Sequence, residues 1–107
     1  MKALGLIETI GFVSAIAALD GAAKSARVTL IGLEPVIGAG KSVSLTVKLE
    51  GDVANVQAAV EAGVWAGRAV GEVLAFRVIP KPHEDADRLI YSKETKASLS
   101  SSGEEGQ

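Results

Sequence analysis

Residues 36–42, Val-Ile-Gly-Ala-Gly-Lys-Ser, come nearer to a phosphate-binding loop than any other stretch of this chain. Such a loop needs a glycine five places before Gly40, where this chain has Pro35, and a helix after the lysine whose first amides hold the phosphates. Instead, apolar and polar residues alternate from Ser42 onward, and the apolar set is Val43, Leu45, Val47 and Leu49. This alternation predicts a half-buried strand over 42–50. The pattern therefore favours a turn between two strands over a loop for nucleotide hydrolysis.

The other reactive side chains form no catalytic pattern. Glu8 and Asp20 are candidates for an acid–base pair, but neither has a histidine or nucleophile partner in the sequence, so we expect structural roles for both. His83 is the single histidine, and with Glu84 and Asp85 beside it the cluster is too small for a metal site. We expect His83 to begin a short helix, and we expect no catalytic activity, cofactor or metal.

Length and composition limit the classes of protein to consider. The 107 residues are enough for one domain with a hydrophobic core, and the net charge of −2 gives no reason to expect nucleic acid or an anionic membrane as a partner. There is no cysteine, no apolar run of membrane-spanning length and no pattern of a secretion signal. We therefore expect a protein of the cytoplasm.

The apolar residues of this chain are unusually small. Hydrophobic residues make up 48% of the sequence but aromatic residues only 4%, so the apolar content is largely alanine and valine. A domain of this size buries only about two thirds of its unfolded surface. Part of the apolar exterior therefore needs a partner, and self-assembly is the simplest explanation.

The order of predicted elements is strand, helix, strand, strand, helix, strand. The strands are predicted at 3–9, 27–36, 42–50 and 72–79, and the helices at 12–25 and from Asp52 to Gly71. A short helix at 84–91 and a polar tail at 92–107 follow. This order predicts an α+β, ferredoxin-like βαββαβ fold, with one antiparallel sheet and two helices on one face.

Each predicted helix carries an apolar stripe. In the first helix the stripe consists of Phe12, Ile16, Leu19 and Ala23. In the second helix it consists of Val53, Val56, Val60, Gly63 and Gly67. We expect Asp52 to cap the start of the second helix and Gly71 to end it. Trp65 lies off this stripe, and it is equally compatible with an interface between subunits and with packing against the C-terminal helix or Tyr91.

Five segments, in this order, resemble the single-domain shell proteins of bacterial microcompartments. They are Ala3-Leu4-Gly5-Leu6-Ile7-Glu8-Thr9, Ala22-Ala23-Lys24-Ser25-Ala26, Ile37-Gly38-Ala39-Gly40, Gly51-Asp52-Val53 with Ala62-Gly63, and Val78-Ile79-Pro80-Lys81-Pro82-His83. The resemblance covers residues 2–90, so we expect a shell domain over 1–91 and a flexible tail beyond it.

The resemblance implies a cyclic hexamer that tiles into flat facets and has a pore on its six-fold axis. Residues 38–40 would line the pore, together with Lys41 at its mouth. Lys24 and Lys81 would lie at the edge where neighbouring hexamers meet. The implied partners are other shell proteins, encapsulated enzymes and small polar metabolites that cross the pore.

The chain departs from the pattern of that family in three places. Lys81 stands where arginine is usual, which replaces a planar fork of donors with a point charge. Ten residues separate Gly40 from Gly51, so the hairpin is longer than the common type. Ala39 replaces a small hydroxyl residue. A second function stays open, since ferredoxin-like domains also occur as regulatory modules that bind small molecules.

Overall fold

The structure is a computed structural model that describes residues 1–37 and 43–81. Within these residues, six elements follow one another in the predicted order. They are β1 (Lys2–Ile10), α1 (Phe12–Ser25), β2 (Thr29–Ile37), β3 (Val43–Asp52), α2 (Val53–Val70) and β4 (Glu72–Lys81). The predicted boundaries differ from these by about two residues at most.

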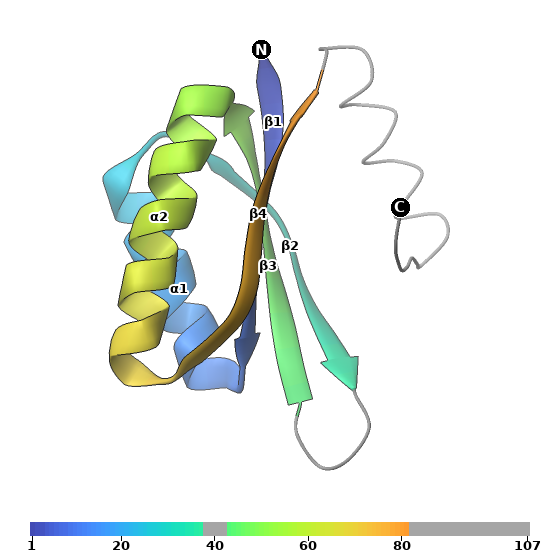
Figure 1. The fold of residues 1–107 in the computed structure, drawn as a ribbon, viewed down its shortest axis with the longest axis vertical. Helices are drawn as coiled ribbons and strands as arrows, with labels where there is room; N and C mark the ends of the chain where they lie inside the picture. Colours follow the sequence, from blue (N-terminus) through green and yellow to red (C-terminus); the bar gives the residue numbers. More distant parts are fainter. Residues whose placement is uncertain (38–42, 82–107) are drawn as a thin grey trace.

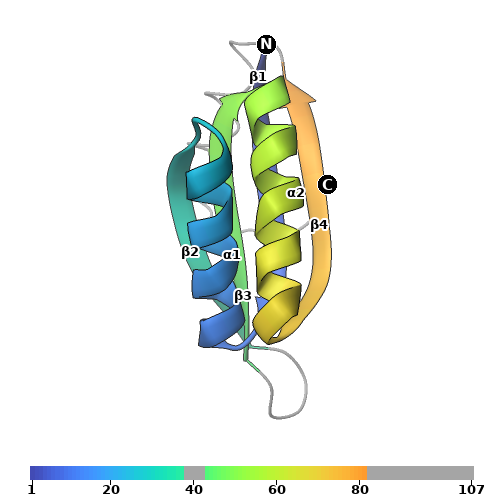
Figure 2. The same ribbon diagram turned by 90° about the vertical axis from the view of Figure 1, so that its left-hand side faces the viewer.

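The strands of the described residues form one antiparallel sheet in the order β2-β3-β1-β4. Both helices lie on the same face of this sheet (Figures 1 and 2). Figure 2 shows α1 on the side of β2 and α2 on the side of β4, so β2 and β4 form the two lateral edges. The predicted α+β, ferredoxin-like fold is therefore confirmed.

The predicted alternation in β3 is confirmed by the burial of its side chains. Leu45, Val47 and Leu49 are buried beneath the helices together with Ile7 of β1, which lies opposite Val47. The residues between them, such as Thr46 and Lys48, point to the other face, which neither of the described helices covers. The period of two along the strand thus separates a core face from an open face.

The helices approach the sheet and each other closely because glycines lie at the contacts. A Cβ atom on Gly63 of α2 would lie 2.7 Å from the Ile7 Cδ1 atom and 2.8 Å from the Ala18 carbonyl oxygen. A Cβ on Gly21 of α1 would lie 2.7 Å from the Ala66 Cβ atom. The buried Ser14 hydroxyl joins the two helices by donating a 2.9 Å hydrogen bond to the Gly67 carbonyl. Small residues at these contacts explain the low aromatic content of the core.

Most of the predicted apolar stripe of α1 lies outside the core, and of its four residues Leu19 alone packs against the core, partly buried. The buried face of α1 consists of small residues, Ser14, Ala15, Ala18 and Ala22, whereas Phe12 is 61% exposed and Ile16 is 41% exposed. The prediction was wrong because the narrow space between α1, α2 and the sheet admits only small side chains. For α2 the prediction holds for Val56, Val60 and both glycines, and Val53 is partly buried.

The ends of the helices differ in how they are stabilised. Asp52 precedes α2 as predicted, but its side chain makes no capping hydrogen bond. Gly71 ends α2, and its backbone N–H donates to the Gly67 carbonyl. Before α1, Gly11 has a φ of +82°, a conformation that favours glycine, and its N–H donates to the Val43 carbonyl at 3.0 Å. This bond ties the start of α1 to the start of β3.

Candidate functional site

The two ends of the sheet carry the two groups of residues that the sequence singled out. The strand pairing Ile37–Val43 marks the end of the sheet that leads into the connection between β2 and β3. The pairing Lys2–Lys81 marks the opposite end. Gly38, Ala39, Gly40 and Lys41, the predicted pore residues, lie outside the described residues, as do His83, Tyr91, the predicted helix at 84–91 and the tail.

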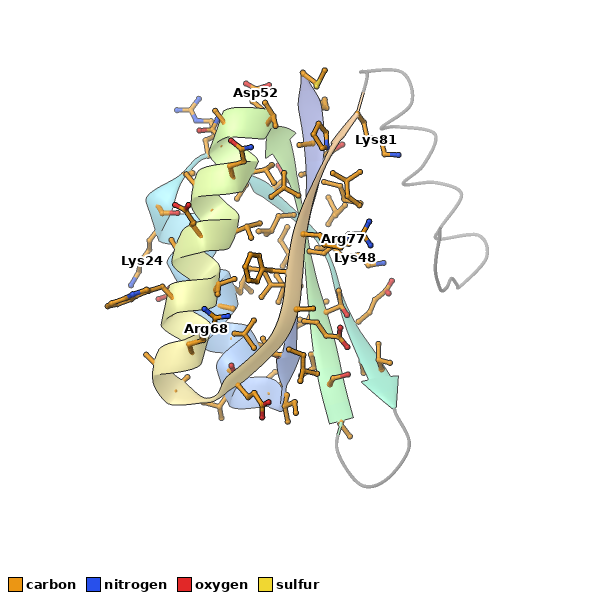
Figure 3. All side chains as sticks on the ribbon, viewed as in Figure 1. Lys24, Lys48, Asp52, Arg68, Arg77 and Lys81 are labelled. Atoms are coloured by element: carbon orange, nitrogen blue, oxygen red, sulfur yellow. The ribbon has the colours of Figure 1, made fainter. Side chains whose placement is uncertain are left out.

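Lys24 lies in the last turn of α1, on the helix side of the molecule (Figure 3). Its side chain is 77% exposed, and its Nζ atom lies 3.1 Å from a carboxylate oxygen of Asp20, one turn earlier in the helix. Because α1 starts at the hairpin end and runs back along the sheet, Lys24 lies toward the opposite end. An exposed pair of this kind stabilises a helix only slightly, by about 0.3–0.5 kcal/mol. Its cation therefore stays accessible to a partner.

Lys81 is the last residue of β4 and points away from the helix layer (Figure 3). It lies opposite Lys2 of β1, so two ammonium groups emerge from neighbouring strands at this end of the sheet. Like charges in cross-strand positions repel each other. Lys24 and Lys81 thus belong to opposite faces of the domain, and the single chain does not join them into one site.

Glu8 and Asp20 cannot act as a catalytic pair, because the sheet and helix layers separate them. Glu8 alternates with the buried Ile7 and Thr9, so its carboxylate faces the open side, where the Ser44 hydroxyl lies 3.4 Å from it. Asp20 pairs with Lys24 on the helix side. The two carboxylates therefore have separate surroundings, and their structural roles stay a prediction.

The open face of the sheet carries a second ion pair. Lys48 of β3 lies 2.9 Å from Glu34 of β2, and only 13% of the lysine side chain is exposed. Arg77 of β4 points to the same side (Figure 3). Charged groups on this face are thus distributed over separate strands. In residues 1–37 and 43–81, no group of three or more potential metal ligands comes together.

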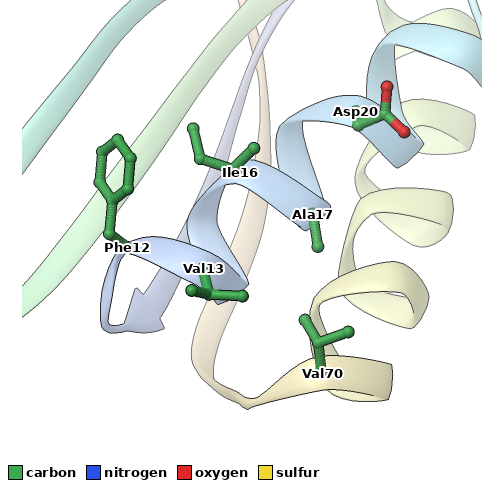
Figure 4. Close-up of a pocket in the computed structure, with 6 residues that line it drawn as sticks. All are labelled: Phe12, Val13, Ile16, Ala17, Asp20 and Val70. Atoms are coloured by element: carbon green, nitrogen blue, oxygen red, sulfur yellow. The ribbon is translucent and has the colours of Figure 1, made fainter.

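A shallow apolar hollow of about 500 Å³ lies on the outer surface of the helix layer (Figure 4). Its lining comes from the first half of α1 and the end of α2, namely Phe12, Val13, Ile16, Ala17, Asp20 and Val70. Asp20 is the single charged residue in this lining. Figure 4 shows Val13 and Ala17 on the side of Val70, whereas Phe12 and Ile16 point the other way. Such a surface lacks the converging polar groups that orient a small ligand.

Trp65 is 80% exposed on the outer surface of α2. Within the described residues it therefore has no substantial packing partner, and packing against Tyr91 concerns residues outside that part of the chain. None of the described helices is both long and apolar enough to span a membrane.

Sequence reasoning missed one feature of the surface, namely that large apolar side chains gather on both lateral edges. Phe12, Ile16 and Leu30 lie on the side of α1 and β2, and Leu74 and Phe76 lie on β4, all of them between 41% and 61% exposed. The sequence feature that could have revealed these residues was the apolar stripe of α1, because its members Phe12 and Ile16 face outward and not toward the core.

Comparison with known proteins identifies relatives of the whole described fold. The pattern of the BMC domain matches residues 3–82. The chain is 48% identical over 89 residues to the bacterial microcompartment shell protein PduA of Citrobacter freundii, covering 83% of this chain and 91% of the relative. It is 43% identical over 97 residues to the carboxysome shell protein CcmK2 of Synechococcus elongatus, covering 89% and 91%. With the shell protein EutM of Salmonella typhimurium it shares 44% over 90 residues, covering 84% and 90%.

A solved structure shows the same fold. The crystal structure of a microcompartment protein from Desulfitobacterium hafniense superposes with a TM-score of 0.68 at 41% sequence identity. The match covers 82% of this chain and 48% of the other, so the present chain spans about half the length of that protein.

Proposed function

Because this chain belongs to the BMC domain family, we propose that it is a structural component of the shell of a bacterial microcompartment. The observation that carries this proposal is the match to the BMC domain over almost all of the described fold, together with relatives that are named as shell proteins. The names of these relatives favour a shell role over a regulatory module that binds small molecules. A structural role also agrees with the separation of Glu8 from Asp20 by the sheet.

We further propose that six copies form a ring, with the connection between β2 and β3 at the centre and Lys81 at the perimeter. The support is that these two features lie at opposite ends of the sheet, along a molecule 37 Å long. Residues 38–41 would then surround the axis, and other shell proteins would join at the rim. Small polar metabolites would cross at the axis to reach enclosed enzymes.

Native mass spectrometry and electron microscopy of the purified protein test this function directly. The expected results are a hexamer at micromolar concentration, and sheets or tubes at high concentration. A dominant monomer or dimer at micromolar concentration would contradict the ring, and hexamers that never associate would contradict the role in tiling.

The substitution Lys81→Arg is expected to strengthen association between rings. Arginine offers a planar fork of donors that binds carbonyl and carboxylate oxygens in pairs, whereas lysine offers a point charge. Sheets of the variant should form at lower protein concentration and should persist at higher salt. Light scattering across a salt series measures this, with Arg77→Lys on the open face as the control. Weaker assembly of the Lys81→Arg variant would show that Lys81 does not serve the edge contact.

The substitution Ala39→Leu is expected to narrow the proposed pore without unfolding the subunit. Six leucine side chains around one axis would replace six methyl groups and would exclude water from the opening. Shells that carry the variant should pass polar metabolites more slowly, and thermal unfolding should be unchanged. A high-resolution structure of the wild-type ring that places residues 38–40 at the perimeter would contradict the assignment.

A further inference from the structure

One part of the open face of the sheet is buried, although neither of the described helices lies over it. Leu4 of β1 is 5% exposed, yet it points away from the helices, because its neighbours Ala3 and Gly5 face them. The other side chains on the open side of β1, among them Leu6 and Glu8, are only partly buried. The burial of Leu4 therefore indicates a cover that the described helices do not supply.

The acidic neighbour of Leu4 is buried at the same place. Glu50 of β3 lies opposite Leu4 and alternates with the buried Leu49, so its carboxylate is on the open face. Its Oε2 atom is buried, and no donor of the described residues forms a hydrogen bond with it. A buried acceptor without a donor costs about 1–3 kcal/mol, more when it is charged, and native proteins nearly always supply a partner. The donors that remain lie in residues 38–42 and 82–107, and Glu50 lies at the end of the sheet where the second range begins.

The chain leaves β4 beside these two residues. Ile79 lies opposite Leu4 on the other side of β1, and Lys81 ends β4 two residues later on the open side of the sheet. We call the residues that follow Pro82, 83–91, the C-terminal segment. If this segment continues as the expected helix, one side of that helix is apolar and consists of Ala86, Leu89 and Ile90. Such a side could cover Leu4.

The charges of the segment complement those of the open face around Leu4. Within the described residues, three cations on this face form no ion pair, namely Lys2, Arg77 and Lys81. The C-terminal segment has three acidic residues and one basic residue, namely Glu84, Asp85, Asp87 and Arg88. Opposite charges favour the docking of this segment on this face.

His83 is the donor of the segment that lies nearest to Glu50 along the chain. From Lys81, Glu50 lies two strands across the sheet and two residues along it, which gives about 12 Å between the Cα atoms at ordinary strand spacings. Two further residues extend the chain by about 7 Å, and the imidazole and carboxylate side chains span the rest. Arg88, in contrast, would lie on the side of the expected helix opposite its apolar residues.

We propose that His83 donates a hydrogen bond to the buried carboxylate oxygen of Glu50 and thereby holds the C-terminal segment on the open face, with its apolar side over Leu4. The bond supplies the donor that the Glu50 oxygen lacks among the described residues. The contact lies within one chain, so it does not depend on the proposed ring. It closes this end of the open face to other partners.

The absence of cysteine from the sequence makes the cover over Leu4 measurable. Leu4→Cys in the full chain is reacted with a maleimide, and we expect slow labelling of the native protein. The added change Leu89→Asp with Ile90→Asp should speed this labelling by about tenfold or more, because it removes the apolar contact with residue 4. The matched control is Ala3→Cys on the core face, which should stay protected in both backgrounds and shows that the fold is intact. Unchanged protection of Leu4→Cys in the Leu89/Ile90 variant would overturn the cover by this segment.

A double-mutant cycle in the Leu4→Cys background tests the hydrogen bond. Glu50→Ala and His83→Ala should each speed labelling by about tenfold, the loss expected for a bond to a charged group. The two changes together should be no faster than either alone, because both remove the same bond. Arg88→Ala is the control and should change the rate by less than about twofold, as expected for an exposed charge.

The remaining outcomes separate this inference from the proposed function. Additive effects of Glu50→Ala and His83→Ala would overturn the bond between them, and coupling of Glu50→Ala with Arg88→Ala would overturn the choice of His83. Protection of Leu4→Cys that appears only in assembled rings would overturn the contact within one chain in favour of a cover by a neighbouring copy. Slow labelling in a chain that never forms rings would contradict the proposed function and still support this inference.

Discussion

Replacement of Lys24 by aspartate is expected to stop rings from joining into sheets while the ring itself still forms. Lys24 lies in the last turn of α1, and its side chain is 77% exposed. At a contact between two rings, the variant would place carboxylates where the wild type has ammonium groups, and it would add a second carboxylate one turn from Asp20. Within one helix this costs only about 0.2–0.5 kcal/mol, so the subunit should stay folded.

The measurement combines native mass spectrometry for the ring with electron microscopy for the sheets. The control is the exchange of the two charges, Asp20→Lys with Lys24→Asp, which keeps both the net charge and an ion pair within α1. If position 24 is the contact, the exchanged variant should lose its sheets as well. Sheets from both variants would show that Lys24 is an ordinary solvated lysine. If the exchanged variant formed sheets and Lys24→Asp did not, the loss of sheets would be due to the change in net charge.

Strand β3 could be predicted from the sequence because it has a core face and an open face. Leu45, Val47 and Leu49 must be buried together, and only a period of two along an extended chain achieves this. The order of the elements, with Gly71 predicted to end the second helix, then left few ways to arrange one sheet under two helices.

The orientation of α1 could not be predicted, because two apolar stripes compete on the same helix. Phe12 and Ile16 have the larger side chains, so hydropathy favours their stripe for the core. The structure buries Ala15 and Ala18 instead, because close contact with α2 leaves no room for larger groups. Both stripes are apolar, so hydropathy alone does not tell which of them faces the core. Their difference appears only when the fold is known.

The sequence predicted where the candidate residues lie on the helices and strands, but not which groups they contact. The predicted helix at 12–25 included Lys24, and Lys81 lay two residues beyond the predicted strand at 72–79; in the structure they lie near the end of α1 and at the end of β4. Their proposed contacts are with other rings, and a single chain holds no information on the distance between such partners. The proposed pore, likewise, exists only as a ring of several copies.

Replacement of Gly63 by valine is expected to have the largest effect on the stability of the subunit. A Cβ atom at this position would lie 2.7 Å from the Ile7 side chain and 2.8 Å from the Ala18 carbonyl oxygen. The oxygen belongs to the backbone of α1, so it cannot move without shifting the whole helix. Overpacking of this kind costs about 1–3 kcal/mol and occasionally more, and the better helix propensity of valine returns only about 0.4 kcal/mol.

We therefore expect Gly63→Val to lower the free energy of unfolding by about 2.5 kcal/mol, the upper end of this cost less the gain in helix propensity, measured by urea denaturation at one fixed protein concentration. The control is Gly32→Val on β2, where the added Cβ would meet the flexible Lys48 side chain at 3.4 Å. Valine suits an edge strand, so the control should change stability by less than about 1 kcal/mol. If both variants lost the same free energy of unfolding, the two glycines would act through their backbone conformation and not through the lack of space for a side chain. A Gly63→Val variant as stable as the wild type would mean that α1 and α2 can separate at little cost, and the small-residue core would need another explanation.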